Sequence, residues 1–342
     1  MVDGDRAVAD AIAAANALEV LSVRGSALVG GSIVRFGIPD GRSVGLVLAQ
    51  LEADGRAGRP EPNSVYSLQQ MGALPQYAFE RIALNAGKTA GKGVRVAVID
   101  SAVAAAHPAL AGVIAAAHDA LPDIPVVDRD HGTSIVGLIA GRGAVRGAAP
   151  GAEVYHSRAF EGGQSTMAAV LRSLDWAAGE KVAIINLSFT GPYNRLMGQA
   201  LDAARARGIV SVAAAGNAGP RAPRAYPAAF DSVIAVTATD TSNRLMNEAN
   251  RGAYVFVAAP GVEVAAPVPG GIDFLTGTSM AAAILSGGIA GLIGEDGSRG
   301  PDWIEAALAA TSIDLGPPGR DKDFGYGLAN FAAARGLPEK LR

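Results

Sequence analysis

Leu-Thr-Gly-Thr-Ser-Met-Ala-Ala-Ala-Ile-Leu-Ser-Gly-Gly-Ile-Ala-Gly, residues 275–291, decides how the rest of this chain is interpreted. Small and hydroxyl-bearing residues come first, and a run of Ala, Ile and Leu with helical periodicity follows. The pattern predicts a helix that begins near Ser279, where the positive end of the helix dipole favours nearby negative charge. Taken alone, Ser279 is better explained as an N-cap than as a nucleophile, because serine is a common capping residue.

Three upstream segments contain the other groups that serine chemistry requires. Residues 94–100 form an apolar strand that ends in Asp100, and His131 opens an apolar helix after Asp-His-Gly-Thr. Residues 209–219 run from a buried strand into Ala-Ala-Ala-Gly-Asn-Ala-Gly, with Asn217 at the tip. Serine attack on a carbonyl needs a base, an orienting carboxylate and a donor for the oxyanion. These four residues supply one group each.

These motifs resemble those of the subtilisin-like serine proteases, or subtilases, over about residues 91–330. The matching motifs are Val-Ile-Asp-Ser, His-Gly-Thr, Ile-Asn-Leu-Ser, Ala-Ala-Gly-Asn, Tyr-Pro-Ala, Val-Ala-Ala-Pro-Gly, Gly-Thr-Ser-Met-Ala and Gly-Tyr-Gly, in family order. The resemblance implies an endopeptidase with Ser279 as nucleophile, His131 as base and Asp100 as the group that orients it. It also implies an oxyanion hole made by the Asn217 side chain and the Ser279 backbone N–H.

The resemblance also places the substrate-binding walls. One wall corresponds to Leu187, Ser188 and Phe189, and the other to Ala214, Ala215 and Gly216. Both walls are uncharged and largely apolar, which predicts an apolar residue before the cut. An extended substrate would pair with these strand edges.

Four positions depart from the usual family pattern. Thr190 stands where glycine is common, Asp130 replaces a glycine before His131, Ser134 replaces a frequent histidine, and Ala283 replaces a proline. None of these changes removes a reacting group, but together they keep a pseudoprotease open as an alternative. A nucleotide-binding α/β protein is a remote alternative, because the glycine fingerprint lacks its strand–helix context.

Composition excludes several other classes. The chain has 342 residues, a formal charge of −3 and no cysteine, which excludes disulfides and thiolate sites and gives no indication of nucleic-acid binding. The four histidines lack zinc-site spacing, so we expect no metal and no cofactor. The family resemblance adds a possible structural calcium, for which 119–130 is only a candidate segment, and a monomer. No run of about eighteen apolar residues is evident, so we expect no membrane span.

The order of apolar segments predicts an α/β fold with a mostly parallel sheet flanked by helices. Expected strands are 94–99, 154–159, 183–189, 209–214, 233–237 and 255–258, and expected helices are 132–140, 165–178 and 194–207. Functional groups are then expected at the carboxyl ends of strands. We expect His107, which precedes Pro108, to be structural.

The first seventy residues predict a separate small α+β unit. Residues 1–68 resemble a subtilase propeptide, which implies an intramolecular inhibitor and folding assistant, with 69–92 as linker and processing region and 93–342 as catalytic domain. Residues 1–10 lack the basic start of a signal peptide. The family resemblance nevertheless implies a secreted or periplasmic protein.

Overall fold

The computed structural model describes residues 3–26, 31–62 and 76–338. The chain forms two compact units, Met1–Gln70 and Met71–Arg342. Each unit has its own hydrophobic core, so each is described by itself.

The N-terminal unit combines two helices with one hairpin. Helix α1 (Asp3–Ala15) precedes strands β1 (Glu19–Ser26) and β2 (Gly31–Gly37), which pair antiparallel, and helix α2 (Val44–Ala53) follows. The Ser43 hydroxyl caps α2 by accepting a hydrogen bond from the Leu46 N–H. Among its described residues, the core cluster of this unit is formed by five buried side chains, which are Ile12, Ala13, Leu18, Val47 and Leu51.

The larger unit is built on a seven-stranded parallel sheet, which confirms the predicted fold class. The spatial order β4-β5-β3-β6-β7-β8-β9 places the early strand β3 near the middle. The strands are β3 (Arg95–Asp100), β4 (Ile114–Asp119), β5 (Glu153–Arg158), β6 (Ile184–Leu187), β7 (Val210–Ala214), β8 (Val233–Thr239) and β9 (Val257–Pro260). A separate antiparallel pair is formed by β10 (Val264–Val268) and β11 (Gly271–Leu275).

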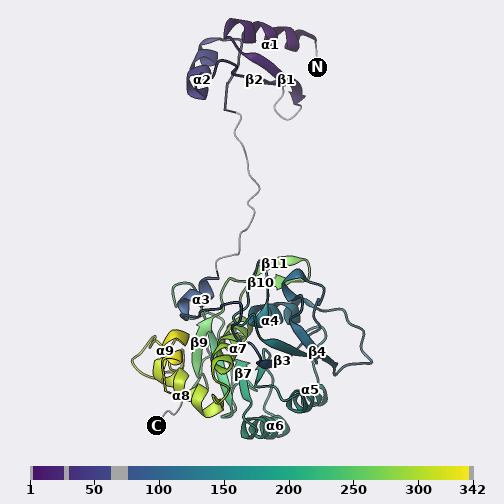
Figure 1. Ribbon diagram of the computed structural model, residues 1–342, viewed down its shortest axis with the longest axis vertical. Coiled ribbons are helices and arrows are strands. Elements are labelled where there is room, and N and C mark those ends of the chain that lie inside the picture. Colours follow the sequence, from purple (N-terminus) through teal and green to yellow (C-terminus); the bar gives the residue numbers. More distant parts are fainter. Residues whose placement is uncertain (1–2, 27–30, 63–75, 339–342) are drawn as a thin grey trace. The chain divides into compact units, whose positions relative to one another are not determined.

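Helices cover both faces of this sheet. Helices α5 (Met167–Gly179) and α6 (Arg195–Ala206) lie together against one face (Figure 1). Helices α4 (Asp130–Ala140) and α7 (Thr278–Glu295) pack on the other face and against each other. The remaining helices of the larger unit are α3 (Tyr77–Arg81), the 3₁₀ turn η1 (Pro108–Leu110), α8 (Pro301–Thr311) and α9 (Phe331–Arg335).

Helix α7 runs through the larger core. Its residues from Thr278 to Leu292 are all buried, and it packs on β6, β7, β8 and β9. Among the described residues it is the one helix with the length and hydropathy of a membrane span, a feature that our inspection of the sequence missed. Because 89% of that span is buried inside the unit, the apolar surface of α7 is explained by core packing.

Parts of the expected linker belong to the larger unit. Helix α3 buries Ala78 and Phe79, and Ile82 directly after it is also buried in the same core as α7. The Gln76 side chain donates a hydrogen bond to the Ala265 carbonyl, and the Tyr77 hydroxyl donates one to the Val262 carbonyl. Residues 64–68, the end of the expected propeptide-like unit, lie outside the described residues.

Candidate active site

Asp100 and His131 form a hydrogen-bonded pair between two elements. Asp100 is the last residue of β3 and is 4% exposed, and His131 is in the first turn of α4. The His131 Nδ1 lies 2.7 Å from the Asp100 Oδ1. A buried carboxylate at this distance accepts the Nδ1 proton, so Nε2 is the ring nitrogen that remains available as a base.

Backbone contacts hold the Asp100 side of this pair in place. The Ser101 N–H donates to the Asp100 Oδ1 at 2.7 Å, and the Ser101 hydroxyl accepts from the Gly132 N–H at 3.0 Å. A Cβ at Gly132 would lie 2.4 Å from the Ser101 carbonyl oxygen, so only glycine permits this close approach. The pair Asp100-Ser101 at the end of β3 therefore contacts the pair His131-Gly132 at the start of α4 through two hydrogen bonds.

His156, on the neighbouring strand β5, contacts the backbone of Ser101 in this cluster, a contact that was not predicted from the sequence. It is 5% exposed on β5, and its Nε2 lies 2.8 Å from the Ser101 carbonyl oxygen. Burial lowers the pKa of His156, which keeps the ring neutral, and the Nε2–H then donates to that carbonyl.

The electrostatic surroundings of His131 favour its protonated form. Burial lowers the pKa of His131, but the charge of Asp100, its hydrogen bond and the charge of Asp128 outweigh burial and raise the pKa above its ordinary value of 6.5. The neutral base is therefore gained as the pH rises through this raised pKa. The stabilisation that protonated His131 gives the fold is complete below pH 6.5 and is lost over the same rise.

Ser279 is the second residue of α7 and does not cap it. The N-cap position is Gly277, with no side-chain capping bond, so the N-cap interpretation of Ser279 is wrong. The Ser279 hydroxyl is 3.1 Å from the Ser188 carbonyl oxygen and donates to it, and the residue is 9% exposed. Among the residues that the structure describes, it makes no hydrogen bond to His131.

Asn217 is oriented by the residue next to Ser279. The Thr278 N–H donates to the Asn217 Oδ1 at 3.0 Å, and the Thr278 hydroxyl donates to the same oxygen at 2.8 Å. Because both partners donate, the amide oxygen is fixed and the Nδ2 group faces Gly277, 3.3 Å from where a Cβ would stand. Within the described ranges, the backbone N–H of Ser279 has no hydrogen-bond acceptor. The Asn217 Nδ2 and the Ser279 nitrogen, which would be 3.9 Å from the same Cβ position, are therefore two donors that lie close together beside Gly277.

A buried polar chain links the middle of α7 to its start. The Ser286 hydroxyl donates to the Asn186 Oδ1 at 3.0 Å, and the Asn186 Nδ2 donates to the Ser188 hydroxyl at 2.8 Å. The Ser188 hydroxyl donates in turn to the Ser279 carbonyl at 3.2 Å. Sequence reasoning missed this chain, although a buried Asn two residues before Ser188 in an otherwise apolar strand is a signal for it.

The predicted substrate walls lie at the ends of β6 and β7, beside Ser279. The Leu187 side chain is buried in the core, so only its backbone could meet a substrate, whereas Phe189 is half-buried and its ring packs 4.8 Å from that of Phe160. Ala214, Ala215 and Gly216 are buried on the other side. Gly216 has a φ of +111°, and a Cβ there would lie 2.3 Å from the Asn250 Nδ2.

The departures from the family pattern have distinct surroundings. The Ser134 hydroxyl donates to the carbonyls of Pro267 at 2.9 Å and Asp130 at 3.0 Å, which ties α4 to β10. Thr190 is exposed, and Ala283 is fully buried inside α7.

His107 caps the turn η1 and bonds the Gly271 carbonyl at 2.9 Å.

The candidate calcium segment 119–130 is held by an arginine. The buried guanidinium of Arg158 bonds Asp119 at 3.1 Å and Glu161 at 2.8 Å, and the Glu161 carboxylate also accepts the N–H of Asp128. The described part of the chain has no group of three or more His, Asp or Glu side chains that could hold a metal. The Asp119 and Glu161 carboxylates are thus already paired with a cation, Arg158.

Comparison with known proteins identifies the family of this chain. The family model described as the subtilase family, Peptidase S8, matches residues 91–327. This chain belongs to the subtilase family. Subtilisin DY from Bacillus licheniformis is 33% identical over 253 residues, which cover 71% of this chain and 91% of that protein.

Two further subtilase relatives extend the comparison. The minor extracellular protease Epr from Bacillus subtilis (strain 168) is 32% identical over 259 residues, 73% of this chain and 40% of that protein. The solved structure of the prenylagaramide maturation protease PagA aligns with a TM-score of 0.64 and 26% identity, covering 72% of this chain and 94% of PagA. Membership of the subtilase family supports serine endopeptidase activity.

Proposed function

We propose that this subtilase hydrolyses peptide bonds through an acyl-enzyme on Ser279, with His131 as general base and Asp100 as its orienting carboxylate. The observation that carries the proposal is the His131–Asp100 bond of 2.7 Å, formed between β3 and α4 on the side of the sheet where α7 begins. The converging Asn217 and Ser279 donors support the same reaction.

Each residue has one role in the reaction. The Ser279 hydroxyl turns from the Ser188 carbonyl to the His131 Nε2, transfers its proton there and attacks the peptide carbonyl carbon. The Asn217 Nδ2 and the Ser279 N–H bind the oxyanion. The protonated His131 then gives its proton to the leaving amine. Water, deprotonated by His131, releases the acyl group and restores Ser279.

Labelling with a fluorophosphonate tests the nucleophile. We expect one covalent adduct at Ser279 in the wild-type chain and none after Ser279→Ala. Ser298→Ala is the matched control, because Ser298 is an exposed serine just after α7 and should not affect labelling. No adduct on processed wild-type protein would favour a pseudoprotease, an alternative that the absent His131–Ser279 bond in the described residues keeps open.

The N-terminal unit is proposed to be a propeptide that is removed by the enzyme itself. Its compactness and small separate core support this role. Since residues 76–82 pack into the larger core, we place the cut before Gln76. Intact mass over time should show cleavage between residues 63 and 75 in wild type and an uncut chain after Ser279→Ala. Cleavage in that variant would identify another protease.

We also propose a substrate preference and a cellular location. Apolar walls at Phe189 and at Ala214–Gly216 support an apolar residue before the cut, which a library of peptides differing at that position would test. A preference for Arg or Lys would contradict this. The name of the extracellular relative Epr supports secretion, and we propose that the chain acts as a monomer outside the cytoplasm.

A further inference from the structure

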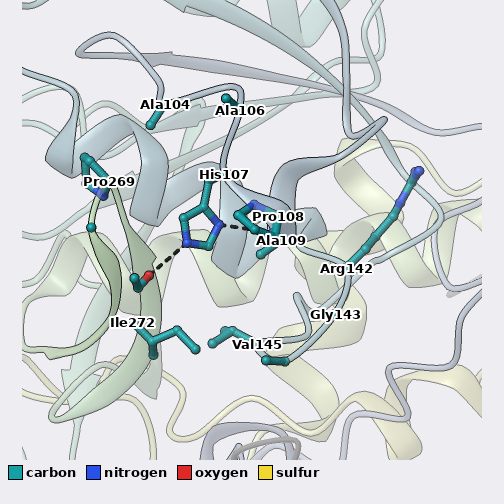
Figure 2. Close-up of a pocket in the computed structure, with 13 residues that line it drawn as sticks. Ala104, Ala106, His107, Pro108, Ala109, Arg142, Gly143, Val145, Pro269 and Ile272 are labelled. Carbon is teal, nitrogen blue, oxygen red and sulfur yellow. Dashed lines mark hydrogen bonds between the residues drawn. The ribbon is translucent and has the colours of Figure 1, made fainter.

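Two neighbouring pockets of the larger unit share Arg142 and Gly143. The first is a cavity of about 550 Å³ between the loop after β3 and the β10–β11 turn, lined mainly by Ala, Pro and Gly. The imidazole ring of His107 lines this cavity and already bonds the Ala109 N–H and the Gly271 carbonyl (Figure 2). Both ring nitrogens of His107 are thus already bonded, and Arg142 points away from this cavity (Figure 2).

The second pocket has different chemistry. It has a volume of about 380 Å³, and four of its eight lining residues are cationic. The four are Lys88, Lys92, Arg142 and Arg146. The other lining residues include no carboxylate, and the chain as a whole carries a formal charge of −3. Like charges are thus concentrated in one concavity of a weakly acidic protein.

None of these four cations forms an ion pair with another described residue. Nine arginines form ion pairs, but none of the four pairs with a carboxylate of residues 3–26, 31–62 or 76–338. Four positive charges around one hollow repel one another, and a concave surface concentrates their field. A bound anion would remove that repulsion.

The pocket is held by rigid backbone. Arg142 is half-buried, and its guanidinium donates to the Pro150 carbonyl at 2.8 Å and to the Gly112 carbonyl at 2.9 Å. The opposite loop is closed by a bond from the Lys92 N–H to the Thr89 carbonyl at 3.0 Å, and the Gly151 N–H bonds the Ala90 carbonyl at 2.8 Å. One cation is therefore fixed before any ligand arrives, which lowers the entropy cost of binding.

The position of the pocket opposes anion binding only weakly. Arg142 follows the C-terminal end of α4, where the helix dipole places about half a negative charge. Four full positive charges exceed this half charge, so the field in the pocket stays positive. His131 is at the other end of α4, roughly 15 Å away along a helix of this length. The pocket is thus separate from the proposed catalytic residues.

We infer that this basic pocket binds a small multivalent oxyanion of the phosphate class. Arginine matches the geometry of phosphate oxygens and lysine supplies point charges, so the mixed set suits a dianion or trianion better than a single carboxylate. The inference does not depend on peptide hydrolysis.

Calorimetric titration with inorganic pyrophosphate at constant ionic strength tests the inference. The full chain carrying Ser279→Ala is used, so that the result is independent of the proposed protease activity. We expect saturable binding of one pyrophosphate per chain, weaker binding of inorganic phosphate, and weakening of both as sodium chloride is raised.

Matched double variants in the same background locate the site. Lys88→Gln with Arg146→Gln should weaken pyrophosphate binding at least about tenfold. Lys181→Gln with Arg207→Gln removes the same charge from exposed residues after α5 and α6 and should leave binding unchanged. No saturable binding, several pyrophosphates per chain, or an equal loss in both double variants would overturn the inference. Equal thermal midpoints of the two variants without pyrophosphate verify their folding.

Discussion

The two halves of the candidate active site are prepared to different degrees. In the acid–base half, Asp100 and His131 already share a hydrogen bond between β3 and α4. In the nucleophile half, the Asn217 amide is oriented, but the Ser279 hydroxyl bonds the Ser188 carbonyl. The difference indicates that each half is assembled by its own neighbours, and the proposed link between them would require the Ser279 side chain to rotate. Apo sites often show such loose catalytic contacts.

The largest effect is expected from breaking the acid–base half. Asp100→Asn should lower kcat by about 10⁴-fold, because an amide favours the wrong imidazole tautomer and cannot stabilise the imidazolium. The measurement is kcat for a peptide ester or amide, with Asp175→Asn on the exposed side of α5 as matched control. A loss below tenfold would show that Asp100 does not orient the base.

Removing the Asn217 donor from the nucleophile half should lower kcat by a smaller factor. Asn217→Ala removes one donor and is expected to lower kcat by about 10²- to 10³-fold with little change in KM, because the donor acts mainly on the transition state. Steady-state kinetics separate the two constants. An increase in KM with kcat unchanged would instead assign Asn217 to ground-state substrate binding.

A change in pH dependence sharpens the description of His131. The rate should rise with pH through the raised pKa of His131, since only the neutral ring accepts a proton. Asp128→Asn removes one charge that raises this pKa, so the acid limb of kcat/KM should move to lower pH by less than about one pH unit. The Asp128 backbone contact to Glu161 remains as an anchor in the variant. An unmoved or upward-shifted limb would contradict this electrostatic account.

The smallest effect on catalysis is expected at the contact between α4 and β10. Ser134→Ala leaves the Pro267 carbonyl without its donor and should destabilise the larger unit by about 1–3 kcal/mol. Thermal unfolding should show a lower midpoint, while kcat per folded molecule stays close to wild type. The exposed Ser298→Ala serves as control, and an unchanged midpoint for Ser134→Ala would mean that water replaces the hydroxyl.

Much of the larger unit could be predicted because its central strands are continuous apolar runs. The observed bounds of β3, β5 and β7 lie within one residue of the predicted ones. The edge strand β4 and the hairpin strand β10 escaped prediction: β4 reads Ile-Ala-Ala-Ala-His-Asp, in which only Ile is a strong β-former, and β10 contains a proline. Their pairing depends on tertiary contacts that one sequence does not reveal.

The candidate site could be predicted to a similar extent. Asp100 was expected at a strand end because a carboxylate directly follows an apolar run, and the structure places it there. The Ser188 carbonyl as partner of Ser279 could not be predicted, because backbone acceptors have no sequence signature. The support of Ser101 by His156 likewise depends on the parallel register of β3 and β5.

The burial of α7 has a consequence for how this protein loses activity on heating. A nucleophile on a surface loop could be displaced by local fluctuations well below the melting temperature, but Ser279 begins a helix that is buried along most of its length. Moving that helix would open the centre of the larger unit, so inactivation and unfolding should coincide in a single cooperative transition.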